Sequence, residues 1–228
     1  MTYPARARKA MKLRTDRPFQ QFGQAYDYAT QGGATGCTDT CLQYLALLWT
    51  GRLYTHDRIR SLTGAPRTRG LRPSEVQSFC TRVGLPYQVR FGMSAYSVLQ
   101  ASERGPVGIA HSYSYWPEWR GYRYAGRTAD GHPNGYAGPL GAAGRTQLAG
   151  FSPPNDAHFG VLLGWDSSLS TYTRRVAAFE PNHDSPSRPE NPPYDQMTSA
   201  QFRRVYESYR RVLGRSLYAL VPTRSLPL

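Results

Sequence analysis

Two short segments, far apart in the chain, most constrain how it can fold. The first runs from Gln31 through a Gly-rich stretch to Cys37, where an apolar pattern typical of a helix begins. The second starts at His158 and continues as a nearly unbroken apolar run to Trp165, which is typical of a buried strand. The sequence therefore predicts a cysteine at the start of a buried helix and a histidine at the start of a buried strand.

This combination has the chemistry of a thiol nucleophile. A cysteine at a helix N-terminus favours the thiolate, because backbone N–H groups and the positive end of the helix dipole face the sulfur. An imidazole within reach can take up the thiol proton. Gln31 precedes Cys37 by six residues and can donate its side-chain amide to a developing oxyanion. We therefore expect Cys37 as nucleophile, His158 as base and Gln31 in the oxyanion hole.

In these features the chain resembles the papain-like cysteine peptidases, whose site residues follow in the order Gln, Cys, His and then Asn or Asp. The pattern Cys37-x-x-x-Cys41, with His158 leading an apolar strand, is most similar to the bacteriocin-processing branch that cleaves double-glycine leaders. The resemblance implies an α+β fold in which a helical half, with a central nucleophile helix, packs on an antiparallel sheet. It also implies a cysteine peptidase or amidase with a Cys-His-acid or Cys-His-amide triad.

The sequence leaves the third member of the triad open. The strand expected after His158 ends in Glu180, where the family branch has Asp. Glu180 can accept the Nδ1–H of the histidine, Asn182 offers an amide for the same role, and Asp184 is a third alternative. Thr38 is a further departure, because the branch has Gly at this position.

The remaining histidines and cysteines have simpler interpretations. His111 closes another apolar strand and is the alternative base, whereas three histidines lie in polar or loop contexts and are expected to be solvated: His56, His132 and His183. Cys41 and Cys80 fall on apolar helix faces and are expected as buried small side chains. Three cysteines do not make a disulfide framework, and no Cys/His cluster has the spacing of a zinc site. The sequence therefore predicts neither a metal nor a cofactor.

The chain divides by composition into three parts. Residues 1–30 form a basic N-terminal arm, 31–182 the papain-like domain, and 183–228 a Pro-rich linker followed by a C-terminal helix and strand. Within the second part, residues 113–156 are a Gly/Tyr-rich insertion, longer than an ordinary connection between elements. Its aromatic side chains can stack on sugar rings or pack on the insertion itself.

Apolar periodicity and stop signals predict the individual elements. Helices are expected over 38–50, 55–62, 74–82, 94–103 and 198–213, and strands over 85–91, 106–112, 159–165, 174–179 and 216–221. The third of these helices is expected to begin with a capping box formed by Ser74 and Gln77.

Charge and hydropathy limit the partners. The net charge is +13 and the pI about 10.0, so the protein is expected to bind an anionic partner. The arginines are dispersed and no nucleic-acid-binding motif accompanies them, so sequence-specific nucleic-acid binding is not expected. No apolar run approaches the roughly 20 residues of a membrane span, and the N-terminus lacks the apolar core of a signal peptide.

Two classes of function follow. The first is a cysteine peptidase or amidase that acts on peptide, with bacterial cell-wall peptide as the substrate and a bacteriophage tail as the setting. The second is a structural virion or assembly protein that keeps a degenerate papain-like fold and is held by neighbouring subunits. Glu180, the aromatic insertion and the basic arm favour the second class. The expected location is a virion, or otherwise the cytoplasm.

Overall fold

The computed structural model describes residues 3–16, 36–112, 157–166, 175–179 and 195–228 of the 228-residue chain. One six-stranded sheet runs through these residues in the order β1-β6-β2-β3-β4-β5, and each described pair is antiparallel. The strands are β1 (Tyr87–Phe91), β2 (Val107–Ser112), β3 (Ala157–Trp165), β4 (Arg175–Phe179), β5 (Asp195–Thr198) and β6 (Tyr218–Pro222). The helices are α1 (Ala5–Asp16), α3 (Cys37–Thr50), α4 (His56–Thr63), α5 (Pro73–Val83), α6 (Ala95–Ala101) and α8 (Ser199–Leu213).

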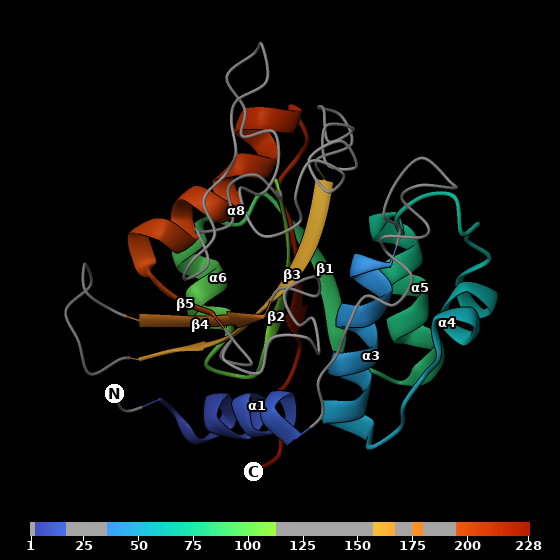
Figure 1. Ribbon diagram of the computed structural model, residues 1–228, viewed down its shortest axis with the longest axis horizontal. Coiled ribbons are helices and arrows are strands. Elements are labelled where there is room, and N and C mark those ends of the chain that lie inside the picture. The colour runs from blue at the N-terminus through green and yellow to red at the C-terminus, as the bar shows by residue number, and fades with distance from the viewer. Residues whose placement is uncertain (1–2, 17–35, 113–156, 167–174, 180–194) are drawn as a thin grey trace, which may run out of the picture.

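Helices lie on both sides of the sheet. Figure 1 shows α3, α4 and α5 together on one side, α6 and α8 on the other, and α1 near one end. This arrangement confirms the predicted α+β class with an antiparallel sheet. None of the described helices is long and apolar enough to cross a membrane.

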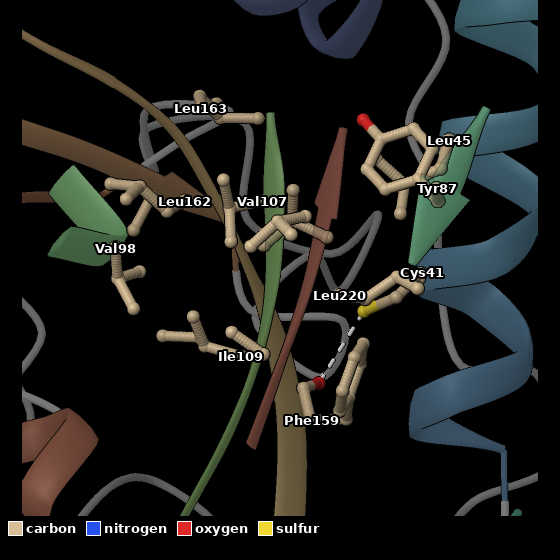
Figure 2. Close-up of a cluster of buried hydrophobic side chains, with 14 of the residues drawn as sticks. Cys41, Leu45, Tyr87, Val98, Val107, Ile109, Phe159, Leu162, Leu163 and Leu220 are labelled. Carbon is tan, nitrogen blue, oxygen red and sulfur yellow. Dashed lines mark hydrogen bonds between the residues drawn. The ribbon is translucent and has the colours of Figure 1, made fainter. Parts of the chain in front are cut away.

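Helix α3 packs against strand β3 of the sheet. It ends at Gly51, which adopts a φ of 70° and donates its N–H to the Leu47 carbonyl at 2.9 Å. Much of the helix is buried, its polar first turn included. Cys41 donates its thiol to the Phe159 carbonyl at 3.4 Å, which holds α3 against β3 (Figure 2).

Helix α1 lies within the stretch that the sequence predicts only as a basic arm. Its apolar side is short, with the small residues Ala7 and Ala10 and the larger Met11 buried. A Cβ atom at Gly164 of β3 would overlap the Ala7 methyl group, so the glycine lets α1 approach the strand closely. The side chains of Arg6 and Lys9 donate to the carbonyls of Leu226 and Pro227, each at 2.7 Å. The N-terminal helix is thereby attached to the C-terminal tail.

The C-terminal elements complete the sheet. β6 lies between β1 and β2, and β5, which the sequence does not predict, pairs with β4. The expected C-terminal segment 183–228 therefore supplies strands to the same sheet as the expected domain 31–182. The insertion 113–156 and most of the Pro-rich linker lie outside the described residues.

The predicted capping box of α5 is wrong. The helix begins at Pro73, and the Glu75 carboxylate accepts the backbone N–H of Arg72 at 2.7 Å. Proline suits the first helical position, since its missing N–H would have no partner inside the helix. Ser74 therefore lies within the first turn rather than at the cap.

Gln77 has a different role, at the outer edge of the sheet, where β1 has a neighbouring strand on one side. Its Oε1 accepts the Val89 N–H at 2.8 Å, and its Nε2 donates to the Tyr87 carbonyl at 3.3 Å. The side-chain amide thus replaces the peptide group of a neighbouring strand along β1. Covering an edge in this way prevents pairing with another chain.

We expect Gln77→Leu to lower the free energy of unfolding by about 1 to 2 kcal/mol, because two backbone groups of β1 lose their partner. Urea denaturation measures the change. Gln100→Leu, on the exposed surface of α6, is the control and should change stability by less than about 0.5 kcal/mol. Equal losses in the two variants would contradict the role of Gln77 at the edge.

Candidate active site

The structure brings Cys37 and His158 together. Cys37 is the first residue of α3, and His158 is the second residue of β3. Each side chain is 5% exposed, and the imidazole is hydrogen-bonded to the thiol. Two residues separated by more than a hundred positions therefore meet where the helix and the strand begin.

The surroundings of Cys37 favour the thiolate. Burial is the largest effect and by itself raises the pKa of the thiol, and the charge of Asp39 adds to this rise. The charge of His158 and hydrogen bonds to His158 and Thr38 act in the opposite direction, and together they hold the pKa of Cys37 below its usual value. A thiolate–imidazolium pair is the form that such a lowered pKa favours.

Thr38, which departs from the family pattern, contributes to this environment. Its Oγ1 lies 3.8 Å from the Cys37 Sγ. Gly36, which precedes Cys37, occupies the N-cap position of α3 and has no side chain to accept the first backbone N–H groups of the helix. Those N–H groups have the polarity that an anion at the helix N-terminus requires.

His111, the alternative base, lies beside His158. The two residues are directly opposite each other in the register of β2 and β3. Their ring centroids are 5.3 Å apart with an interplanar angle of 81°, and His111 is fully buried. Two imidazoles therefore share one face of the sheet, and the hydrogen bond to the Cys37 thiol belongs to His158.

The three cysteines differ in chemistry although all are buried and none is part of a disulfide. Burial raises the pKa of Cys80 to about 12. Cys41 uses its thiol proton in the hydrogen bond to the Phe159 carbonyl. The expectation that Cys41 and Cys80 are buried small side chains is confirmed.

A buried ion pair next to the site was not predicted from the sequence. Asp39, in the first turn of α3, accepts from Arg60 of α4 through both carboxylate oxygens, with Nε at 2.9 Å from Oδ1 and 3.1 Å from Oδ2. Burial raises the pKa of Asp39, against the hydrogen bonds and charge of Arg60 and the charge of His56. The available signal was a carboxylate in the first turn of a helix expected to be buried, because a buried carboxylate requires a partner.

His56 also differs from expectation. Instead of being solvated, it is half-buried and its Nε2 lies 3.2 Å from the Thr40 Oγ1. This contact joins α4 to the first turn of α3.

The other predicted site residues, Gln31, Glu180 and Asn182, lie outside the described residues, as does Asp184. β4 ends at Phe179, which pairs with Val161 of antiparallel β3. The described part of the chain contains no group of three or more His, Cys, Asp or Glu side chains that could hold a metal ion.

No protein-family model matches the chain, and no curated protein matches it significantly. Among solved structures, it is similar to a crystal structure from Bacillus anthracis that has the provisional name C39-like peptidase. The two share 14% identity with a TM-score of 0.37, and the match covers 68% of this chain and 61% of that one, less than two thirds of its length. At this identity and TM-score, the likeness supports no argument about function. The function has to be argued from the chemistry of the site.

We expect iodoacetamide at mildly acidic pH to alkylate Cys37 well before Cys41 or Cys80, because its lowered pKa keeps a larger thiolate fraction. Peptide mass spectrometry of the native protein measures the three rates. His158→Gln should slow alkylation of Cys37, since it removes the cation that stabilises the thiolate. Equal labelling of all three cysteines would contradict a reactive Cys37.

Thr38→Val keeps the shape of the side chain and removes its hydroxyl group. We expect alkylation of Cys37 below neutral pH to become about two- to tenfold slower, the effect of losing one hydrogen bond to the thiolate. Thr38→Ser retains the hydroxyl and should react like the natural protein. If the valine and serine variants react at the same rate, Thr38 does not stabilise the thiolate.

Proposed function

We propose that this protein is a cysteine peptidase or amidase of the papain-like type, with Cys37 as nucleophile and His158 as base. The supporting observation is the contact between a thiol at a helix N-terminus and an imidazole at the start of a strand, together with the lowered pKa of that thiol. Nucleophile and base within hydrogen-bond reach are the signature of covalent catalysis by cysteine.

The proposed reaction has two steps. In the first, the Cys37 thiolate attacks the carbonyl carbon of an amide, and the His158 imidazolium gives its proton to the leaving nitrogen as the C–N bond breaks. The product is a thioester on Cys37 and a free amine. In the second step, His158 takes a proton from water and the resulting hydroxide attacks the thioester. The C–S bond breaks, the carboxylic acid leaves, and the Cys37 thiolate and His158 imidazolium are restored.

The tetrahedral intermediates of both steps carry a negatively charged oxygen. We assign its stabilisation to the backbone N–H of Cys37 and the side-chain amide of Gln31, since preorganised donors aimed at developing charge are a large source of rate enhancement. Gly36 supports this assignment because it adds no side chain at the N-cap.

The third member of the triad is Glu180 or Asn182. β4 runs antiparallel to β3, and its last residue, Phe179, pairs with Val161, three residues after His158. β4 therefore runs towards the end of β3 that holds His158, and this direction supports the proposal. A carboxylate or an amide there can accept the Nδ1–H of His158 and orient the ring.

The substrate class we propose is bacterial cell-wall peptide, with the protein acting as a bacteriophage tail component. The net charge of +13 supports an anionic polymer as the target. The alternative, a structural virion or assembly protein of the same fold, requires an unreactive Cys37.

We expect Cys37→Ser and His158→Ala each to lower kcat on peptide substrates by about a thousandfold or more, as for other nucleophile–base pairs. Purified cell-wall peptide and a double-glycine leader peptide are the two substrates, with new amino termini measured as the product. Cys80→Ala is the matched control and should retain activity. Activity that survives Cys37→Ser would exclude the mechanism, and an inactive natural protein with an unreactive thiol would favour the assembly role.

Glu180→Gln and Asn182→Ala distinguish the two candidates for the third position. We expect one substitution to lower kcat by tenfold or more and the other to leave it nearly unchanged, because only one group can accept the Nδ1–H of His158. Steady-state kinetics with the cleaved peptide measures both. Two unaffected variants would show that neither residue orients the imidazole.

A further inference from the structure

The first turn of α3 carries a second charge besides that of Cys37. Asp39 follows Cys37 by two residues and is 1% exposed. A carboxylate at a helix N-terminus interacts favourably with the helix dipole. However, its negative charge also acts against the Cys37 thiolate and raises the pKa of that thiol. The same turn of helix therefore holds two groups that compete as anions.

Arg60 meets the Asp39 carboxylate with two of its nitrogens. Nε lies 2.9 Å from Oδ1, and Nη2 forms an ion pair with Oδ2. The guanidinium is itself only 7% exposed, so solvent screens the pair weakly. A planar guanidinium matches a carboxylate in this way, whereas an ammonium group cannot.

The remaining Arg60 nitrogen fixes the guanidinium from the other side. Nη1 donates to the carbonyls of Pro66 and Arg69, each at 2.7 Å. Arg69 in turn forms an ion pair with Glu75, whose carboxylate accepts the backbone N–H of Arg72. A continuous polar network therefore connects the first turn of α3 with the start of α5.

The ionisable neighbours of the two anions are few among the described residues. Around Cys37 they are His158 of β3, Asp39 of its own helix and Tyr218 of β6, whose pKa burial raises well above the usual value. Around Asp39 they are Arg60 and His56, both of α4. Arg60 is the group that contacts the Asp39 carboxylate directly.

We propose that Arg60 is a positioning residue that acts on Cys37 through Asp39. Its positive charge compensates the negative charge of the carboxylate beside the thiolate, and its hydrogen bonds hold the first turn of α3 in place. Its hydrogen bonds to the Asp39 carboxylate make its effect on the thiol an indirect one. The inference rests on the proposed function only in taking Cys37 as the reactive thiol. Two residues thus stabilise the thiolate. His158 interacts with it directly, and Arg60 acts through the neighbouring Asp39.

The experiment compares Arg60→Met, Asp39→Asn and the double variant by the pH dependence of Cys37 alkylation with iodoacetamide, on full-length protein whose fold is checked by circular dichroism. Arg60→Met leaves a carboxylate without its counter-ion. We expect the midpoint of the pH–rate curve, at which half of the Cys37 thiol is ionised, to move to higher pH. If the midpoint rises by one pH unit, the alkylation rate below it should fall by about tenfold. Asp39→Asn removes the competing charge and should move the midpoint to lower pH.

The double variant tests whether Arg60 acts through Asp39. With the carboxylate gone, loss of Arg60 should no longer move the midpoint upward, so the double variant should lie close to the natural protein or below it. A double variant whose midpoint stays as high as that of Arg60→Met overturns the proposal. Arg58→Met, which removes an exposed charge from the same helix, is the control and should leave the midpoint in place.

Two further results keep the proposal falsifiable. If Arg60→Met does not fold, Asp39→Asn still tests the proposal. An unchanged or higher midpoint in that variant would show that the Asp39 carboxylate does not compete with the Cys37 thiolate. If the natural Cys37 titrates like an ordinary thiol, the proposed function fails. Midpoints that move in opposite directions in the two single variants would even then support the coupling between Arg60 and Cys37.

Discussion

The packing of the start of α3 against the start of β3 is the contact on which the rest of the site depends. It requires an apolar helix that can be buried deeply and a strand that can approach it closely. The hydrogen bond from Cys41 to the Phe159 carbonyl sets the distance between the two elements, one helical turn after Cys37. Gly108 of the neighbouring strand makes room, since a Cβ atom there would lie 2.7 Å from the Phe159 ring. The meeting of Cys37 and His158 is thus a consequence of core packing.

Local patterns were sufficient to predict the elements that hold the site. The apolar spacing of α3 and the apolar run of β3 are properties of neighbouring residues, so periodicity finds both. Helix α1 was missed because its buried face consists of small side chains such as Ala7 and Ala10 among basic residues. β5 was missed because a strand of four residues, Asp195–Thr198, has too few positions to show alternation. In both cases tertiary contacts, rather than local pattern, determine the structure.

Partners that are distant in sequence were beyond the reach of such patterns. Arg60 follows Asp39 by 21 residues on a different helix, and no spacing rule connects the two. Gln77 was interpreted as a cap because it lies near the start of a helix, whereas its amide serves the edge of β1. A polar residue in an amphipathic helix has several possible partners, and the fold decides which of them comes within reach.

The polar first turn of α3 shows how stability and function are divided along one helix. From Cys41 onward, apolar side chains hold the helix in the core, and among them Leu42 and Leu45 are fully buried. The three residues after Cys37 are buried but polar. Thr38 contacts the Cys37 thiol, Asp39 contacts Arg60, and Thr40 contacts His56. Buried polar groups stabilise a fold only when their partners are in place. The first turn is therefore held in one arrangement by contacts that an apolar turn could not make, and the thiol of Cys37 is oriented with it.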